Sequence, residues 1–352
     1  MAISLPVLNF PASGFTMSMH DRMIGITATL PVEILFAGGV RPVDLNNMFI
    51  TDSNANHLVS KAEVQGFSHN ICSWIKGIYS VVFAKNIKEV IAVTGGDCSN
   101  TIALGEVLCH ADINVTAFEY PQNKDRDRLI AQMERLQKRF SVTWPETEAV
   151  WSRFKQIRNK LKRLDRLTWE THKVTGYENH LFLVQSSDFN SDPGIFEKEL
   201  DKFLVEAEAR EPRKPDIRLG YLGVPPVFTG FYELIDSLGA GVVFNEIQRQ
   251  FSMPFDCNNI IDQYLTYTYP YDMDGRLKDI KAAVKERNID GLVHYTQTFC
   301  YRQIYDIIIR EEMDIPVLTL EGDRPGPVDS RITLRIETFI EMLRQRKYGD
   351  IF

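Results

Sequence analysis

Paired cysteines and long apolar runs are both missing from this 352-residue chain. It has no CxxC motif, and its five cysteines are an odd number, so neither a disulfide framework nor a zinc site built on close pairs is indicated. No apolar run is long enough to span a bilayer. The opening MAISLPVLNFPASG lacks the charged and apolar regions of a secretory signal. We therefore expect a cytoplasmic protein with reduced thiols.

A basic surplus and two common catalytic motifs are also absent. The formal net charge is −7, which argues against the basic footprint of a nucleic-acid binder. Without a GxxxxGK[ST] loop, the chain is not expected to hydrolyse ATP itself. Without a G-x-S-x-G elbow, a serine hydrolase is disfavoured. With 44% hydrophobic and 25% charged residues, the composition is that of a globular protein whose length suggests two or more domains.

Short apolar runs alternate with helix-length segments over residues 20–125. The runs are apolar on both faces, as in strands buried in a parallel sheet. This alternation predicts a doubly wound α/β lobe. The predicted strands are 22–30, 41–46, 88–98 and 114–121, and the predicted helices include 31–39 and 75–84.

The pattern changes in the middle of the chain and then returns. Residues 126–212 carry apolar residues at helical spacing with dense charge of both signs, and the proline-containing stretch 206–216 is the best linker candidate. Residues 213–352 again alternate strands with helices and end in an amphipathic helix. We predict two doubly wound, Rossmann- or flavodoxin-like lobes, 1–125 and 213–352, joined by a helical segment and linker, 126–212. A cleft between such lobes is a natural ligand site.

Three cysteines follow apolar runs or precede helices at polar, turn-like positions: Cys72, Cys98 and Cys300. Open α/β sheets place ligands beyond the carboxyl ends of their strands. A single cysteine is more often a small core residue, but all three at such positions indicate metal ligation. Three thiolates suit zinc or an iron–sulfur cluster, and their wide spacing favours the cluster.

The surroundings of each cysteine add detail to this hypothesis. Gly95 and Gly96 precede Cys98 and allow a sharp turn, and a helix beginning just after it is expected to lower the thiol pKa. The other two cysteines, Cys109 in a predicted helix and Cys257 in a loop, are interpreted as structural.

At these residues the chain resembles the 2-hydroxyacyl-CoA dehydratase family, which includes benzoyl-CoA reductase and double-cubane cluster proteins. The resemblance rests on IGITATLPVEILFAGGVRPVDL, on the separated Cys72 and Cys98, and on DGLVHYTQTFC, IPVLTLEGD and RIETFIEML. It implies a cluster held in the cleft by Cys72, Cys98 and Cys300, as [4Fe-4S] or as half of a bridged [8Fe-9S] double cubane. It also implies a homodimer or heterodimer and a separate ATP-hydrolysing iron–sulfur activator.

The resemblance implies a radical dehydration of a 2-hydroxyacyl thioester, started by one low-potential electron from the activator. As acid–base or supporting groups we name His69, His294 and Glu321, with Asn70, Ser99 and Gln297 nearby. Two other functions stay open: a double-cubane reductase that acts on small molecules, and a non-catalytic two-lobed module that binds an anion.

Overall fold

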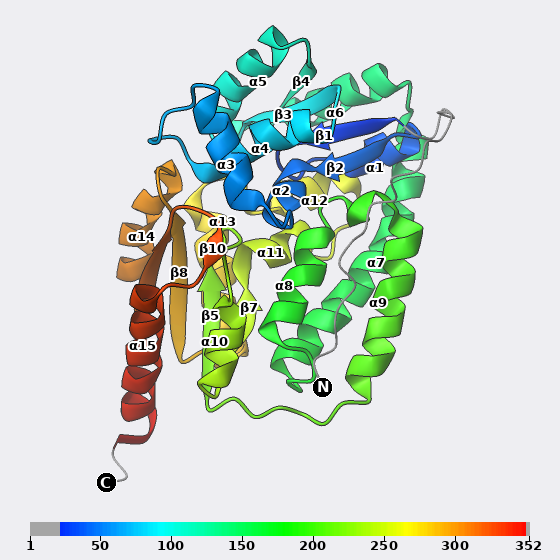
Figure 1. Ribbon diagram of the computed structural model, residues 1–352. Helices are drawn as coiled ribbons and strands as arrows, with labels where there is room; N and C mark the ends of the chain where they lie inside the picture. Colours follow the sequence, from blue (N-terminus) through cyan, green and yellow to red (C-terminus); the bar gives the residue numbers. More distant parts are fainter. Residues whose placement is uncertain (1–21, 350–352) are drawn as a thin grey trace.

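The computed structural model describes residues 22–349, which form two α/β lobes and a helical segment (Figure 1). The opening residues, where no secretory signal is predicted, lie outside the described residues. Within residues 22–349, no helix combines the length and the apolar character that a membrane crossing requires.

The first lobe is built on a four-stranded parallel sheet in the order β2-β1-β3-β4. Its short strands lie where the apolar runs predict them, and the helices follow the amphipathic stretches. The elements are β1 (Met23–Ile26), α1 (Val32–Ala37), β2 (Arg41–Asp44), α2 (Leu45–Ile50), α3 (Ala55–Val64), α4 (Ser73–Ala84), β3 (Glu89–Gly95), α5 (Asn100–His110) and β4 (Asn114–Glu119).

Four long helices follow the first lobe. The longest, α7, begins with a capping box between Thr143 and Glu146 and a proline in its first turn, which are strong start signals. Helix α9 continues into the predicted linker, so the connection to the second lobe is shorter than expected. The elements are η2 (Gln122–Lys124), α6 (Arg126–Phe140), α7 (Trp144–Trp169), α8 (Gly176–Gln185), η3 (Phe189–Ser191) and α9 (Pro193–Glu208).

The second lobe repeats the topology of the first. Its four-stranded parallel sheet has the order β7-β5-β8-β9, so each lobe places its second strand outermost, followed by the first, third and fourth. A two-stranded sheet, β10-β6, lies apart from it. The elements are β5 (Ile217–Leu222), β6 (Phe228–Thr229), α10 (Phe231–Ser237), β7 (Ala240–Asn245), α11 (Glu246–Phe251), α12 (Ile260–Thr266), α13 (Met273–Glu286), β8 (Gly291–Gln297), η4 (Tyr301–Tyr305), α14 (Asp306–Glu312), β9 (Val317–Gly322), β10 (Gly326–Pro327) and α15 (Ser330–Tyr348).

Both sheets are buried on both faces, which confirms the doubly wound prediction. In the first lobe, Ile24 packs into a core shared with the long helices, and Val90 into a second core shared with α3, α4 and α5. In the second lobe, Leu219 faces the core beside α15, and Leu292 the core beside α13. The helical segment lies beside the second sheet and below the first lobe, so that it joins the two (Figure 1).

Candidate functional site

Two of the three cysteines occupy equivalent positions in the two lobes. Cys98 lies three residues after β3 ends at Gly95, and Cys300 lies three residues after β8 ends at Gln297. In each case the cysteine carbonyl accepts a backbone hydrogen bond from the first turn of the helix that follows, from Thr101 at 2.9 Å and from Gln303 at 3.2 Å. Each lobe therefore presents a thiol at the carboxyl edge of its sheet.

The third cysteine comes from a different kind of position. Cys72 is the N-cap residue of α4, the helix that precedes β3, and its side chain is buried. Its carbonyl accepts a hydrogen bond from Lys76 at 3.2 Å. All three cysteines thus lie at the start of a helical segment, where unpaired backbone N–H groups are available to a sulfur.

Burial and backbone amides act on these thiols in opposite directions. Burial raises the pKa of Cys72 to about 12 and that of Cys98 to about 11, and it also raises the pKa of Cys300. Backbone hydrogen bonds, such as those from Trp74 to Cys72 and from Asn100 to Cys98, lower these values in part. The amides at the helix start lower the Cys98 pKa as predicted, but desolvation outweighs them, so the net shift does not favour the thiolate.

The three thiols also affect one another. Charge on Cys300 or Cys98 raises the pKa of Cys72, and charge on Cys300 raises that of Cys98, so each pair is within electrostatic reach. Nevertheless, within residues 22–349 no three His, Cys, Asp or Glu side chains converge closely enough to hold one metal ion.

The lobes touch directly beside Cys98. Gly96 has φ +85°, and a Cβ there would lie 2.7 Å from the carbonyl oxygen of Pro270, so only glycine fits the turn. Tyr269 donates a hydrogen bond to Asp97 Oδ1 at 3.0 Å, and Tyr301 donates to the Asp97 carbonyl at 2.9 Å. Second-lobe side chains therefore hold the turn that carries the first-lobe thiol.

A small cavity of about 30 Å³ lies at the carboxyl ends of β5 and β8, and Cys300 is on its wall. His294 also lines it, and the ring Nδ1 of His294 lies 2.7 Å from Asp306 Oδ1. Hydrogen bonds from His294, Thr319 and Arg310 lower the pKa of Asp306, although burial alone would raise it. A charged Asp306 favours the tautomer with a proton on Nδ1, which leaves Nε2 as the acceptor of a neutral ring.

The same cavity contains two arginines that the sequence interpretation missed. Arg276 is buried and forms a two-pronged ion pair with the fully buried Glu246, at 2.6 and 2.9 Å. The positive charge of Arg276 and Arg302 lowers the pKa of Cys300. Arg302 lies only two residues beyond Cys300, which is a local signal. No sequence pattern places Arg276 or Asp306 at the cavity beside Cys300.

The other predicted acid–base residues lie elsewhere. His69 is exposed, and its Nδ1 is 3.3 Å from Glu63, which also pairs with the buried Lys76 at 2.7 Å. Glu321, on the edge strand β9, is exposed. Of the supporting residues, Asn70 and Ser99 are exposed. Gln297 lines the small cavity, and its side-chain amide donates to the Asp323 carbonyl at 2.9 Å.

The structural interpretation of the remaining cysteines holds only in part. Cys109 lies in α5, inside the predicted helix, but its side chain is exposed and not part of a core. Cys257 is partly buried in a loop, with its sulfur 3.4 Å from Thr266 Oγ1.

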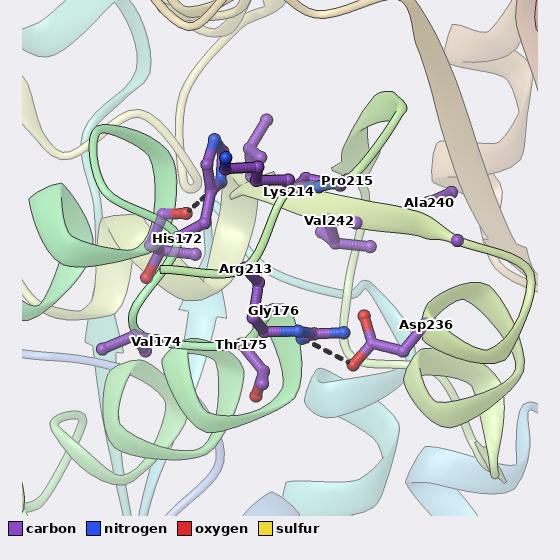
Figure 2. A pocket seen from close by; sticks show the side chains of 14 residues that line it. His172, Val174, Thr175, Gly176, Arg213, Lys214, Pro215, Asp236, Ala240 and Val242 are labelled. Atoms are coloured by element: carbon purple, nitrogen blue, oxygen red, sulfur yellow. Dashed lines mark hydrogen bonds and ion pairs between the residues drawn. The ribbon is translucent and has the colours of Figure 1, made fainter. Parts of the chain in front are cut away.

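A larger cavity, of about 160 Å³, lies away from the thiols (Figure 2). It is at the amino end of β7, the opposite edge of the second sheet from Cys300. Arg213 in its wall pairs with Asp236 at 3.0 Å. His172 contacts Arg218 at 2.6 Å and the Thr168 carbonyl at 3.1 Å. Most polar groups of this cavity therefore already have partners in the protein.

Comparison with known proteins adds the family. A search of curated proteins finds no match to the chain. Residues 27–343 match the family described as 2-hydroxyglutaryl-CoA dehydratase, D-component. This match covers both lobes, the helical segment and all three cysteines of the site. The chain belongs to the 2-hydroxyglutaryl-CoA dehydratase D-component family.

Proposed function

We propose that this chain is the iron–sulfur component of a 2-hydroxyacyl-CoA dehydratase, with Cys72, Cys98 and Cys300 as cluster ligands. The observation that carries the proposal is that Cys98 and Cys300 follow equivalent strand ends in two lobes that touch beside Cys98, while Cys72 is buried at a helix start and its thiol pKa is raised by both other thiols. Each also lies at the start of a helical segment. Family membership supports the same function.

The donor set suits a cluster better than a single ion. In an iron–sulfur cluster each cysteine binds its own iron, so the sulfurs need not meet at a point. Within residues 22–349 no three His, Cys, Asp or Glu side chains surround one ion position, so the assignment rests on the positions of the cysteines and on the family. Backbone N–H groups near each sulfur stabilise negative charge on it. When bound, the cluster would supply one-electron chemistry and an iron site for a substrate oxygen.

The protein's own part in the reaction is orientation and proton handling. Dehydration removes the 2-hydroxyl and a C3 hydrogen of the acyl thioester as water, with one electron added at the start and returned at the end. His294 is the best placed acid–base group, because it lines the cavity beside Cys300 and is oriented by Asp306. The exposed His69 and Glu321 would need a substrate or a partner subunit to reach them, and they are the weaker proposals.

The partners follow from what the chain does not supply. It has no phosphate-binding loop, so ATP hydrolysis is assigned to a separate iron–sulfur activator. A homodimer or a heterodimer with a related subunit would complete the enzyme, as the family implies.

One observation favours the double-cubane reductase as a second candidate. The cavity beside Cys300 is about 30 Å³, which is room for about one water molecule and far less than an acyl-CoA arm needs. A reductase of small molecules uses the same cysteine pattern and needs less room. The dehydratase remains the first proposal, because a substrate can open such a site by induced fit.

Anaerobic purification and a direct assay test the proposal. The protein should be brown and contain iron and acid-labile sulfide. With an ATP-hydrolysing iron–sulfur activator, ATP and titanium(III) citrate as electron donor, it should convert 2-hydroxyglutaryl-CoA to the unsaturated thioester, detected by mass spectrometry. A brown protein that reduces small molecules but dehydrates no 2-hydroxyacyl-CoA would favour the double cubane. Colourless protein without iron after anaerobic reconstitution would contradict both redox functions.

A further inference from the structure

Arg302 connects the two strand-end thiols of different lobes. It lies two residues after Cys300, and its backbone N–H and its positive charge both lower the pKa of that thiol. Its side chain crosses to the other lobe, where Nη2–H donates to the carbonyl of Gly96 at 2.8 Å. Gly96 is two residues before Cys98. One residue therefore lies beside one thiol in the chain and holds the turn that carries the other.

The side chain of Arg302 is itself held on several sides. Nη1–H donates to the carbonyl of Tyr269 at 3.1 Å, and the guanidinium carbon lies 4.4 Å from the centre of the Tyr269 ring. The ring of Tyr301 lies 5.3 Å from the same carbon. Both tyrosines hydrogen-bond to Asp97 across the lobe boundary. A planar fork of donors that is held by stacking has little freedom to move.

The charge of Arg302 is available to a ligand in the site. Within residues 22–349 no carboxylate oxygen lies within 4.0 Å of its guanidinium nitrogens, although the charge of Asp97 acts on it from farther away. By contrast, Arg276, the other arginine of the cavity, is neutralised by Glu246. Partly buried charges are costly without a partner, and an anionic group held by the thiols would be one.

We propose that Arg302 is a positioning residue that sets the separation of Cys98 and Cys300 and supplies the positive charge that balances an anionic thiolate-bound group. The charge role, which is to balance an anionic group on the thiols, rests on the proposed function. The bracing role, which is to hold the two thiol segments at a fixed separation, rests on hydrogen bonds within the chain. The two roles predict different effects of two substitutions. Arg302→Lys keeps the charge but loses the fork, whereas Arg302→Gln loses the charge.

The bracing role is tested on the metal-free protein by hydrogen–deuterium exchange. Arg302→Lys and Arg302→Gln should both raise amide exchange about tenfold in residues 96–101 and 299–305. Arg324→Gln is the matched control, because Arg324 also crosses between the lobes, donating to Glu63 at 2.8 Å, but does not line the thiol cavity. Arg324→Gln should raise amide exchange in α3, which contains Glu63, and leave the two thiol segments unchanged. Unchanged exchange in both thiol segments of both Arg302 variants would overturn the brace.

The charge role is tested on the reconstituted protein by anaerobic redox titration. Arg302→Gln should shift the midpoint potential of the cluster to more negative values, because reduction adds negative charge that Arg302 no longer offsets. Arg302→Lys and Arg324→Gln should stay near the wild-type value. An unchanged potential in Arg302→Gln would overturn the charge role. If the wild-type protein binds no iron, the proposed function fails. The hydrogen–deuterium exchange experiment still shows whether Arg302 holds the two thiol segments together.

Discussion

The two lobes share one scaffold and use it differently. Strand order and helix order correspond throughout, so that α4 before β3 has its counterpart in α13 before β8. After the third strand of each lobe comes a cysteine. The helix before that third strand begins differently in the two lobes. The first lobe has Cys72 at the start of α4, whereas the second has Asp272 at the start of α13, where its side chain accepts a hydrogen bond from the backbone N–H of Asp274.

This difference divides the work between the lobes. The first lobe supplies two thiols, and the second supplies one thiol with the cavity that contains His294 and the two arginines. In the proposed function, the first lobe would therefore supply most of the cluster ligands, and the second would supply the groups that can act on a ligand. Similar folds do not require similar sites, since function depends on a few side chains at the strand ends.

Removing single thiols tests this division with the largest expected effect. Cys72→Ala, Cys98→Ala and Cys300→Ala should each lose most of the iron and sulfide bound by the wild-type protein after anaerobic reconstitution. Cys109→Ala is the matched control, since Cys109 is exposed on α5, and it should retain both. Retention of full iron by Cys72→Ala would show that the asymmetry between Cys72 and Asp272 has no role in the metal site.

The turn before Cys98 can be compared with the helix after it by adding one methyl group to a glycine in each. Gly96→Ala forces a side chain into a left-handed conformation against Pro270, and we expect a loss of about 3 kcal/mol in the free energy of unfolding, measured in urea. Gly105→Ala in α5 is the control: its new Cβ meets Val115 at an ordinary 3.6 Å, and the helix should gain about 1 kcal/mol. Equal stability of the two variants would contradict the tight contact at Gly96.

The tie between the lobes at Glu63 should depend on pH. Hydrogen bonds from Lys76 and Arg324 lower the pKa of Glu63 to about 2, so its contribution is present above its ordinary pKa and is lost as the pH falls through 2. Glu63→Gln should cost about 2 kcal/mol near pH 7, measured by urea unfolding, and should approach wild type near pH 2.

A control for Glu63→Gln is Glu312→Gln, because Glu312 forms an exposed pair with Lys281 at 2.6 Å. Its cost should be about 0.5 kcal/mol or less. A constant difference between Glu63→Gln and wild type from pH 7 to pH 2 would argue that the charge of Glu63 does not tie the lobes.

The smallest effect concerns a second-lobe feature without a first-lobe counterpart. Asp306→Asn should cost about 1 kcal/mol, and it should weaken the preference of His294 for a proton on Nδ1, because it removes the carboxylate charge and leaves one acceptor oxygen for His294, Thr319 and Arg310. Nitrogen-15 NMR of the imidazole measures this, with His294→Gln to assign the signal. A His294 signal that is identical in Asp306→Asn and wild type would contradict the orienting role.

Much of the scaffold could be predicted from the sequence, because strands buried on both faces are continuous apolar runs between helices. The runs ending at Gly95 and Gln297 located two strand ends, and hence Cys98 and Cys300. The local effect of the helix start on the Cys98 pKa could be predicted, but the net shift could not. The desolvation that outweighs the amides depends on how deeply the folded chain buries the thiol.

The contacts between lobes could not be predicted. Arg302 reaches Gly96, and Arg324 reaches Glu63, over separations of 206 and 261 residues. Such pairs have no periodicity that connects them. For the same reason the sequence favoured the exposed His69, which is close to Cys72 in the chain, and missed Asp306, which lies beside His294 only in space.

The most direct test of the central claim is an anaerobic crystal structure of the reconstituted protein. The account predicts iron and sulfide density bound by the sulfurs of Cys72, Cys98 and Cys300 together, with ligands from both lobes and the Arg302 guanidinium beside it. Density bound within one lobe alone, or iron held by Cys109 or Cys257, would contradict it.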